Sequence, residues 1–249
     1  MEETRKSIQA FIAEQSKGLD TGKSNYFGIV FGEVIKYYDY LIVLLPKYQE
    51  ISELHVQSIK DRIKREKNIP QGSRTMTNGD IAWRNKSYVR QIRLHLELES
   101  LFIYASILLD RIASATQYYF GKSSRQWRSF EAMKNYLDGY CENKNLSKPS
   151  KGLMKTMSWL YGNVCEFRHT IVVHKHEDSY RVRLVFGTGW DNDSNEAYFN
   201  LGLMYPKGNE KTVISKKPSE ILNKLNGFIY LWIEYLKLNE SGRKADSSA

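Results

Sequence analysis

Two residues near the end of a predicted helix have side chains suited to phosphodiester chemistry. Arg168 and His174 bound the segment R-H-T-I-V-V-H. RNA carries its own nucleophile, the 2′-hydroxyl, so its cleavage needs a proton-transfer group active near neutral pH and a cation beside phosphorus. Histidine, with an unperturbed pKa of about 6.5, suits the first role, and the planar guanidinium of arginine matches phosphate oxygens in the second. This chemistry requires neither a metal ion nor another cofactor.

The spacing of the two residues limits how they can cooperate. Six residues of α-helix separate two side chains by about 120° around the helix and by about 9 Å along it. A single copy therefore places the arginine and the histidine on different sides, unless the helix frays at the β-branched run 171–173. A second copy facing the first across a two-fold axis would let both residues border one groove. We expect the segment to be half of a composite site in a homodimer formed through this helix.

The helix predicted to carry the segment, residues 151–173, has the clearest apolar pattern in the chain. Its apolar side chains recur at intervals of 4, 3, 4, 3 and 4 residues: Leu153, Met157, Leu160, Val164, Phe167 and Ile171. This spacing is typical of the core of a helical bundle. The same position also allows a purely structural interpretation, in which Arg168 forms an ion pair, for instance with Glu166 or Asp178, and His174 only ends the helix.

The segment resembles the R-x(4–6)-H signature of the HEPN superfamily, in which a polar residue commonly follows the arginine. The resemblance covers seven residues on a late helix of a helical protein. It implies a metal-independent endoribonuclease that works as a dimer in a toxin–antitoxin, phage-defence or RNA-processing system. It also implies that Arg168 and His174 form the catalytic pair, with His169 at the polar position, and that an antitoxin protein is a possible partner. Asparagine is frequent at the position that His169 occupies here.

The remaining elements predict a mainly α fold. Helical patterns cover residues 2–17, 27–45 (ended by Pro46), 47–67, 80–120, 124–142 and 218–238. Residues 180–215 instead alternate apolar and polar side chains with turn formers between them, which indicates a β-hairpin with a third short strand. The predicted fold class is therefore an up-and-down helical bundle, HEPN-like, with a small antiparallel β insertion between the last two helices.

We expect one domain over residues 1–249, because a chain of 249 residues can bury one sizeable core. The predicted bundle core covers 27–176, the β insertion 180–215 and the final helix 218–238, and residues 240–249 form a disordered tail. The N-terminus has no apolar signal segment, and the run 38–46 is too short to span a membrane. These features predict a cytoplasmic protein without a membrane partner.

The net charge of +9 favours a polyanionic partner such as RNA. Basic residues gather between positions 60 and 93, where Trp83 and Tyr88 could stack on bases. The predicted RNA-binding residues are Lys64, Arg65, Arg84, Lys86, Arg90 and Arg93. A solvated helix face followed by a loop would show the same composition.

Two other interpretations use different residues. His169, His174 and His176, with Glu177 and Asp178 nearby, could hold a transition metal, but their spacing fits no established ligand pattern. We therefore predict no metal site. Beyond the nuclease, the chain could be a non-catalytic helical module that binds RNA or protein, or a scaffold whose hairpin and apolar helices dock another protein.

Overall fold

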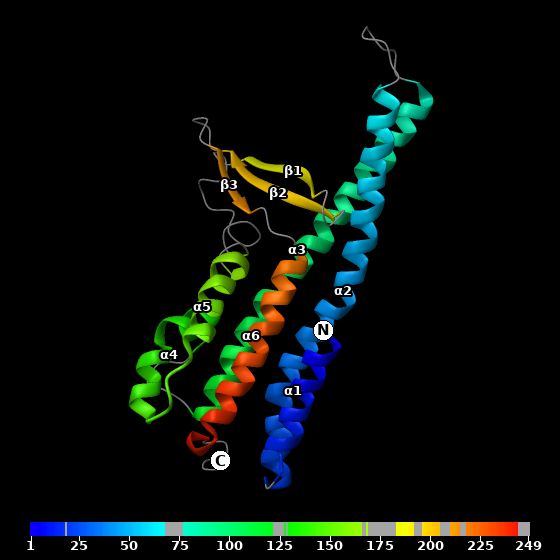
Figure 1. The fold of residues 1–249 in the computed structure, drawn as a ribbon. Helices are drawn as coiled ribbons and strands as arrows, with labels where there is room; N and C mark the ends of the chain where they lie inside the picture. Colours follow the sequence, from blue (N-terminus) through cyan, green and yellow to red (C-terminus); the bar gives the residue numbers. More distant parts are fainter. Residues whose placement is uncertain are drawn as a thin grey trace. The chain divides into compact units, whose positions relative to one another are not determined.

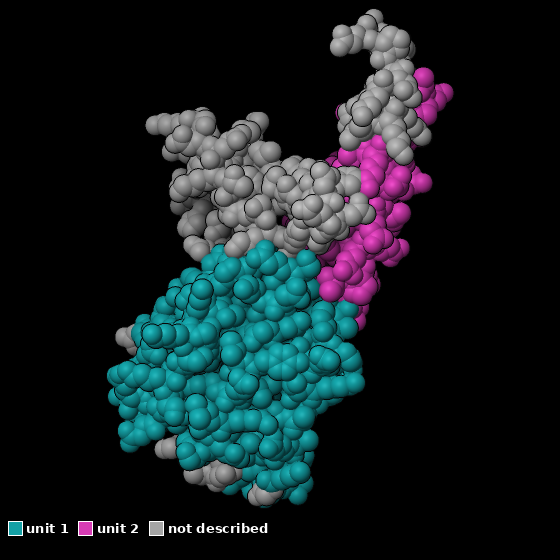
Figure 2. All heavy atoms as spheres, viewed as in Figure 1, with its two compact units in different colours: residues 1–42, 102–174, 219–249 teal, residues 43–101, 175–218 magenta. Residues whose placement is uncertain are grey.

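The computed structural model describes residues 1–17, 19–67, 77–121, 127, 129–165, 168, 183–191, 196–204, 210–214 and 218–243. Over these residues the chain is mainly helical (Figure 1). Its contacts divide it into two compact units (Figure 2). Unit 1 contains residues 1–42, 102–174 and 219–249, and unit 2 contains residues 43–101 and 175–218.

The α-helices are α1 (Glu2–Gln15), α2 (Thr21–Lys67), α3 (Asn78–Phe120), α4 (Phe130–Lys144), α5 (Lys151–Leu160) and α6 (Pro218–Leu238). Serine side chains cap two of them, as sequence preferences at helix starts predict. Ser129 Oγ accepts a hydrogen bond from the backbone N–H of Ala132 at the start of α4, and Ser150 Oγ accepts one from Leu153 at the start of α5. A π-helical turn, Tyr161–Cys165, follows α5 directly.

Aromatic side chains from four helices meet in the core of unit 1. Phe31 of α2 stacks on Trp232 of α6, with ring centroids 5.9 Å apart, and lies 5.6 Å from the ring of Phe11 in α1. The indole N–H of Trp232 donates to Thr116 Oγ1 of α3 over 2.8 Å, so this buried polar group is satisfied. These contacts tie α1, α2, α3 and α6 together.

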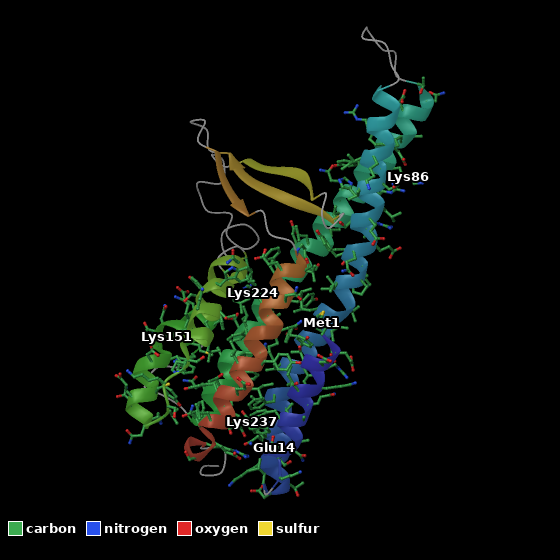
Figure 3. All side chains as sticks on the ribbon, in the orientation of Figure 1. Met1, Glu14, Lys86, Lys151, Lys224 and Lys237 are labelled. Carbon is green, nitrogen blue, oxygen red and sulfur yellow. The ribbon has the colours of Figure 1, made fainter. Side chains whose placement is uncertain are left out.

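The edge of the same unit is closed by polar contacts. Lys237 of α6 and Glu14 of α1, both labelled in Figure 3, form an ion pair of 2.6 Å. A 3₁₀ turn, Glu240–Gly242, follows α6, and the guanidinium of Arg243 donates to Gln15 Oε1 over 3.0 Å. The described chain therefore continues into the segment predicted to be a disordered tail, while residues 244–249 of that segment lie outside the described residues.

Three strands lie between α5 and α6: β1 (Arg183–Asp191), β2 (Glu196–Met204) and β3 (Glu210–Ile214). They form an antiparallel sheet in the order β1-β2-β3. The register pairs residue 183 with 204 and residue 191 with 196, and it shifts between β2 residues 201 and 202 opposite β3.

The predicted fold class requires correction. We expected one up-and-down bundle, with a small β insertion added between its last two helices. The described chain is mainly helical, but two helices of 47 and 43 residues, α2 and α3, each contribute to both units. The segment 175–218 is grouped with residues 43–101 in unit 2 and is therefore not an appendage of a single bundle. The reason is that the helices do not end where the sequence signals suggested.

The boundary at Pro46 is the clearest of these errors. Proline lacks a backbone N–H and clashes with the preceding turn, so it usually ends or kinks a helix. Helix α2 nevertheless runs through Pro46, joining the predicted helices 27–45 and 47–67 into one element. Pro46 is exposed, so its ring adds no core packing to offset the lost hydrogen bond. A second error concerns 151–173, where α-helix ends at Leu160 and π geometry follows.

We expect Pro46→Ala to stabilise the protein. Alanine restores the backbone hydrogen bond and removes the ring clash, changes worth roughly 1–3 kcal/mol in a helix interior. The measurement is thermal or denaturant unfolding followed by circular dichroism at 222 nm. An unchanged midpoint would contradict this expectation, and a lowered midpoint would show that the proline is needed for the path of α2.

Candidate functional site

Arg168 lies shortly after the π-helical turn and is held by the side chains of α3. Its guanidinium NH1 donates to Ser106 Oγ over 3.2 Å and lies 3.6 Å from Asp110 Oδ2. A quarter of the arginine side chain remains exposed, whereas its Nε is buried and has no hydrogen-bond partner among the described residues. The cation is therefore fixed in orientation while part of it faces solvent.

Asp110 connects this arginine to the beginning of α4. Its Oδ1 accepts a hydrogen bond of 2.8 Å from the backbone N–H of Phe130, while its Oδ2 lies beside Arg168. Phe130 is the first residue of α4, where unpaired N–H groups favour a negative charge. One carboxylate thus satisfies both a helix start and a half-buried cation.

Cys165 lies beside the same group of side chains but does not provide a nucleophile. Burial raises its pKa to about 12, and the nearby Asp110 charge adds to this effect, while Ser106 and Arg168 oppose it. A thiol with such a pKa stays protonated near neutral pH, and the thiolate is the reactive form. Cys165 therefore serves as a buried apolar side chain.

The two predicted histidines, His169 and His174, lie outside the described residues, so the distance between them and Arg168 remains a prediction. The same holds for His176 of the rejected metal interpretation. In the part of the chain that the structure describes, no group of three or more His, Cys, Asp or Glu side chains could hold a metal ion.

The predicted RNA-binding residues belong to the C-terminal end of α2 and the N-terminal half of α3. Arg84, Lys86 and Arg93 are exposed on α3, where Figure 3 labels Lys86. Arg90 differs, because its NH1 donates to the carbonyl oxygen of Leu54 (3.3 Å) and to Ser58 Oγ. Arg90 thus ties α3 to α2. The side chains of Lys64 and Arg65, in the last turn of α2, are outside the described set.

The sequence reasoning missed a buried histidine close to Arg90. His55 of α2 is 5% exposed, and neither ring nitrogen has a hydrogen-bond partner within the described ranges. Burial lowers its pKa, and the positive charge of Arg90 lowers it further. The helical spacing of His55 from the apolar positions of α2 was the available signal, because it places the imidazole on the inward face.

Two further residues, Ser106 and Asp110, were missed although they hold the candidate arginine. They are four positions apart, and such residues share one face of a helix. A charged residue within the apolar run L-L-D-R-I of α3 signals a buried or half-buried partner. The sequence alone could not name that partner, because Arg168 is 58 residues further along the chain.

Comparison of the chain with protein-family models, with curated proteins and with solved structures finds no match. None of the described helices is both long enough and apolar enough to cross a membrane.

We expect Asp110→Ala to lower the free energy of unfolding by roughly 2–3 kcal/mol, because it leaves Arg168 and the Phe130 N–H without this acceptor. Asp110→Asn should cost less, since an amide oxygen can still accept the backbone hydrogen bond. Chemical denaturation of both variants measures the difference. Equal stability of Asp110→Ala and the unaltered chain would contradict the shared role of this carboxylate.

His55 predicts a dependence of stability on pH. Since burial holds the folded-state pKa below the unfolded value of about 6.5, its contribution is present above that pH and is lost as the pH falls toward the folded pKa. We expect His55→Leu to be more stable than the unaltered chain and to lose less stability between pH 7.5 and pH 5.5. Identical pH slopes in thermal unfolding would refute this assignment.

Proposed function

We propose that this chain is a metal-independent endoribonuclease of the HEPN type, with Arg168 and His174 as its catalytic pair. The observation that supports the proposal is the placement of Arg168. Its guanidinium is oriented by Asp110 and Ser106 and keeps a quarter of its side-chain surface exposed. A cation that is fixed before the substrate arrives needs no reorganisation when charge develops on a phosphate.

In the proposed reaction the 2′-oxygen of the RNA attacks the adjacent phosphorus, and the bond from phosphorus to the 5′-oxygen breaks. His174 accepts the proton of the 2′-hydroxyl, and the leaving 5′-oxygen takes up a proton. Arg168 stabilises the negative charge on the phosphate oxygens. The products are a 2′,3′-cyclic phosphate and a 5′-hydroxyl end. Because six residues of α-helix would separate the pair, the proposal includes a homodimer in which two copies of the segment face each other.

The exposed basic side chains of Arg84, Lys86 and Arg93 support RNA as the substrate. The proposal also includes Lys64 and Arg65, which the sequence places in the last turn of α2. Arg90 contributes by fixing α3 against α2, since its guanidinium donates to Leu54 and Ser58. The resemblance to HEPN proteins would place the activity in toxin, phage-defence or RNA-processing roles, in which an antitoxin protein is a possible partner.

A non-catalytic module is the second candidate, and the Asp110 contacts favour it. An arginine that neutralises a half-buried carboxylate at a helix start has a sufficient structural reason to be present. A chain of this kind would bind RNA in a salt-sensitive manner and leave it intact.

The test is incubation of the purified chain with single-stranded RNA in EDTA, with analysis of the ends formed. We expect cleavage that leaves 2′,3′-cyclic phosphate ends. His174→Ala and Arg168→Ala should each reduce the rate by at least about 100-fold, which is the lower range for loss of general acid–base or charge-stabilising groups.

Arg5→Ala is the matched control, because Arg5 is also a partly exposed arginine in an ion pair, with Asp39 at 2.7 Å. This control should lose stability but retain cleavage. Undiminished cleavage by both His174→Ala and Arg168→Ala would overturn the assignment of the pair, and intact RNA after long incubation would favour the non-catalytic module.

A further inference from the structure

Five tyrosines on α2 and α3 form two groups of ring contacts in unit 1, one of three rings and one of two. Two helices supply them: Tyr26, Tyr37 and Tyr40 from α2, and Tyr104 and Tyr118 from α3. We call this set the tyrosine row. Centroid distances are 5.0 Å between Tyr40 and Tyr104, 5.5 Å between Tyr37 and Tyr40, and 5.3 Å between Tyr26 and Tyr118.

The helical spacing gives the row its length. Tyr26 and Tyr37 are eleven residues apart, or about three turns, so they share one face of α2 at a separation of about 16 Å along its axis. Tyr104 and Tyr118 are fourteen residues apart, or about four turns and 21 Å along α3. The row therefore follows both helices over a distance that suits an extended chain better than a compact ligand.

Much of the aromatic and apolar surface of the tyrosine row and its neighbours is exposed to solvent. Tyr26 is 56% exposed, Tyr40 is 38% exposed, and Ile29, between them on α2, is 64% exposed. Tyr37 and Tyr104 are half-buried. Exposed aromatic and apolar side chains grouped in this way on a folded domain mark a contact surface.

Two cations lie over one ring of the row, that of Tyr37. Lys36 Nζ is 5.4 Å and Arg111 Cζ is 5.6 Å from the centroid of Tyr37. Both also pair with Glu33, at 3.1 Å and 3.8 Å, so the three groups together carry one net positive charge. About half of each cationic side chain is exposed (48% and 46%), which leaves room for a phosphate.

We propose that the tyrosine row binds single-stranded RNA, with bases against the tyrosine rings and phosphates against Lys36 and Arg111. Stacking of a base on an aromatic side chain is tolerant of sequence, and it requires the unpaired base faces that only a single strand presents. The net charge of +9 attracts a polyanion. A second copy of the chain would instead bring two net-positive rows together, and like charges at an interface are unfavourable.

Part of the tyrosine row and the residues that hold the candidate arginine lie on the same stretch of α3. Tyr104 and Arg111 lie within the same two turns as Ser106 and Asp110, which hold Arg168, but on a different side of the helix. Along the helix axis these positions span about 10 Å. The inference rests on the proposed function, because it takes the bound RNA to be the substrate. It assigns to the tyrosine row the single-stranded segment beside the cleaved bond.

The experiment measures the fluorescence anisotropy of a labelled twelve-nucleotide oligoadenylate mixed with the full chain. It is carried out in the His174→Ala background, so that cleavage does not interfere. Tyr37→Leu and Tyr104→Leu keep apolar packing but remove the stacking surface, and each should weaken binding by at least about five-fold. Tyr37→Phe should bind like the parent, because the ring remains. Lys36→Gln should flatten the dependence of binding on salt.

Tyr230→Ala is the matched control, since Tyr230 is as exposed as Tyr40 (38%) but lies on α6. It should leave binding unchanged, and circular dichroism verifies the fold of each variant. Unchanged RNA binding by both leucine variants would overturn the inference. So would leucine variants that lose self-association, measured by light scattering, instead of RNA binding. Wild-type chain that binds through the row but never cleaves would refute the proposed nuclease alone.

Discussion

The carboxylate of Asp110 is the interaction on which the candidate site depends. One of its oxygens accepts the first backbone N–H of α4, and the other lies beside the guanidinium of Arg168. A half-buried charge is stable only when its polar surroundings compensate for the lost hydration. Here a helix start and a cation provide that compensation together. The orientation of Arg168 and the start of α4 are therefore coupled through a single side chain of α3.

The position of Asp110 is in turn fixed by the core of unit 1. Its neighbours in α3, Leu108, Leu109 and Ile112, are fully buried, and one turn further Thr116 accepts the indole N–H of Trp232. An element packed this closely resists rotation about its axis, because small shifts create voids or clashes. The precision of the contacts to Arg168 thus originates in apolar and aromatic packing remote from the arginine.

The sequence predicted those elements whose signals are local. The helices expected at 2–17, 80–120 and 218–238 correspond to α1, α3 and α6 within two residues at each end. The prediction ended a helix at Pro46 because proline usually interrupts helices. The helical residues on both sides of Pro46 nevertheless continue as one helix, α2. The partners of Arg168 were beyond prediction because a contact between residues 110 and 168 leaves no local pattern. Similarly, helical periodicity offers a signal that His55 faces inward on α2, but it could not show that the ring nitrogens lack partners among the described residues.

A structural and a catalytic role for Arg168 are compatible in physical terms. A guanidinium has five N–H donors in a rigid plane, and the contacts of Arg168 to Ser106 and Asp110 both use NH1. Asp110 also divides its charge between the arginine and the start of α4, so it neutralises the guanidinium only in part. The ion pair costs some positive potential but removes the rotational freedom of a long side chain. For a group that must meet developing charge in one geometry, that loss of freedom favours catalysis.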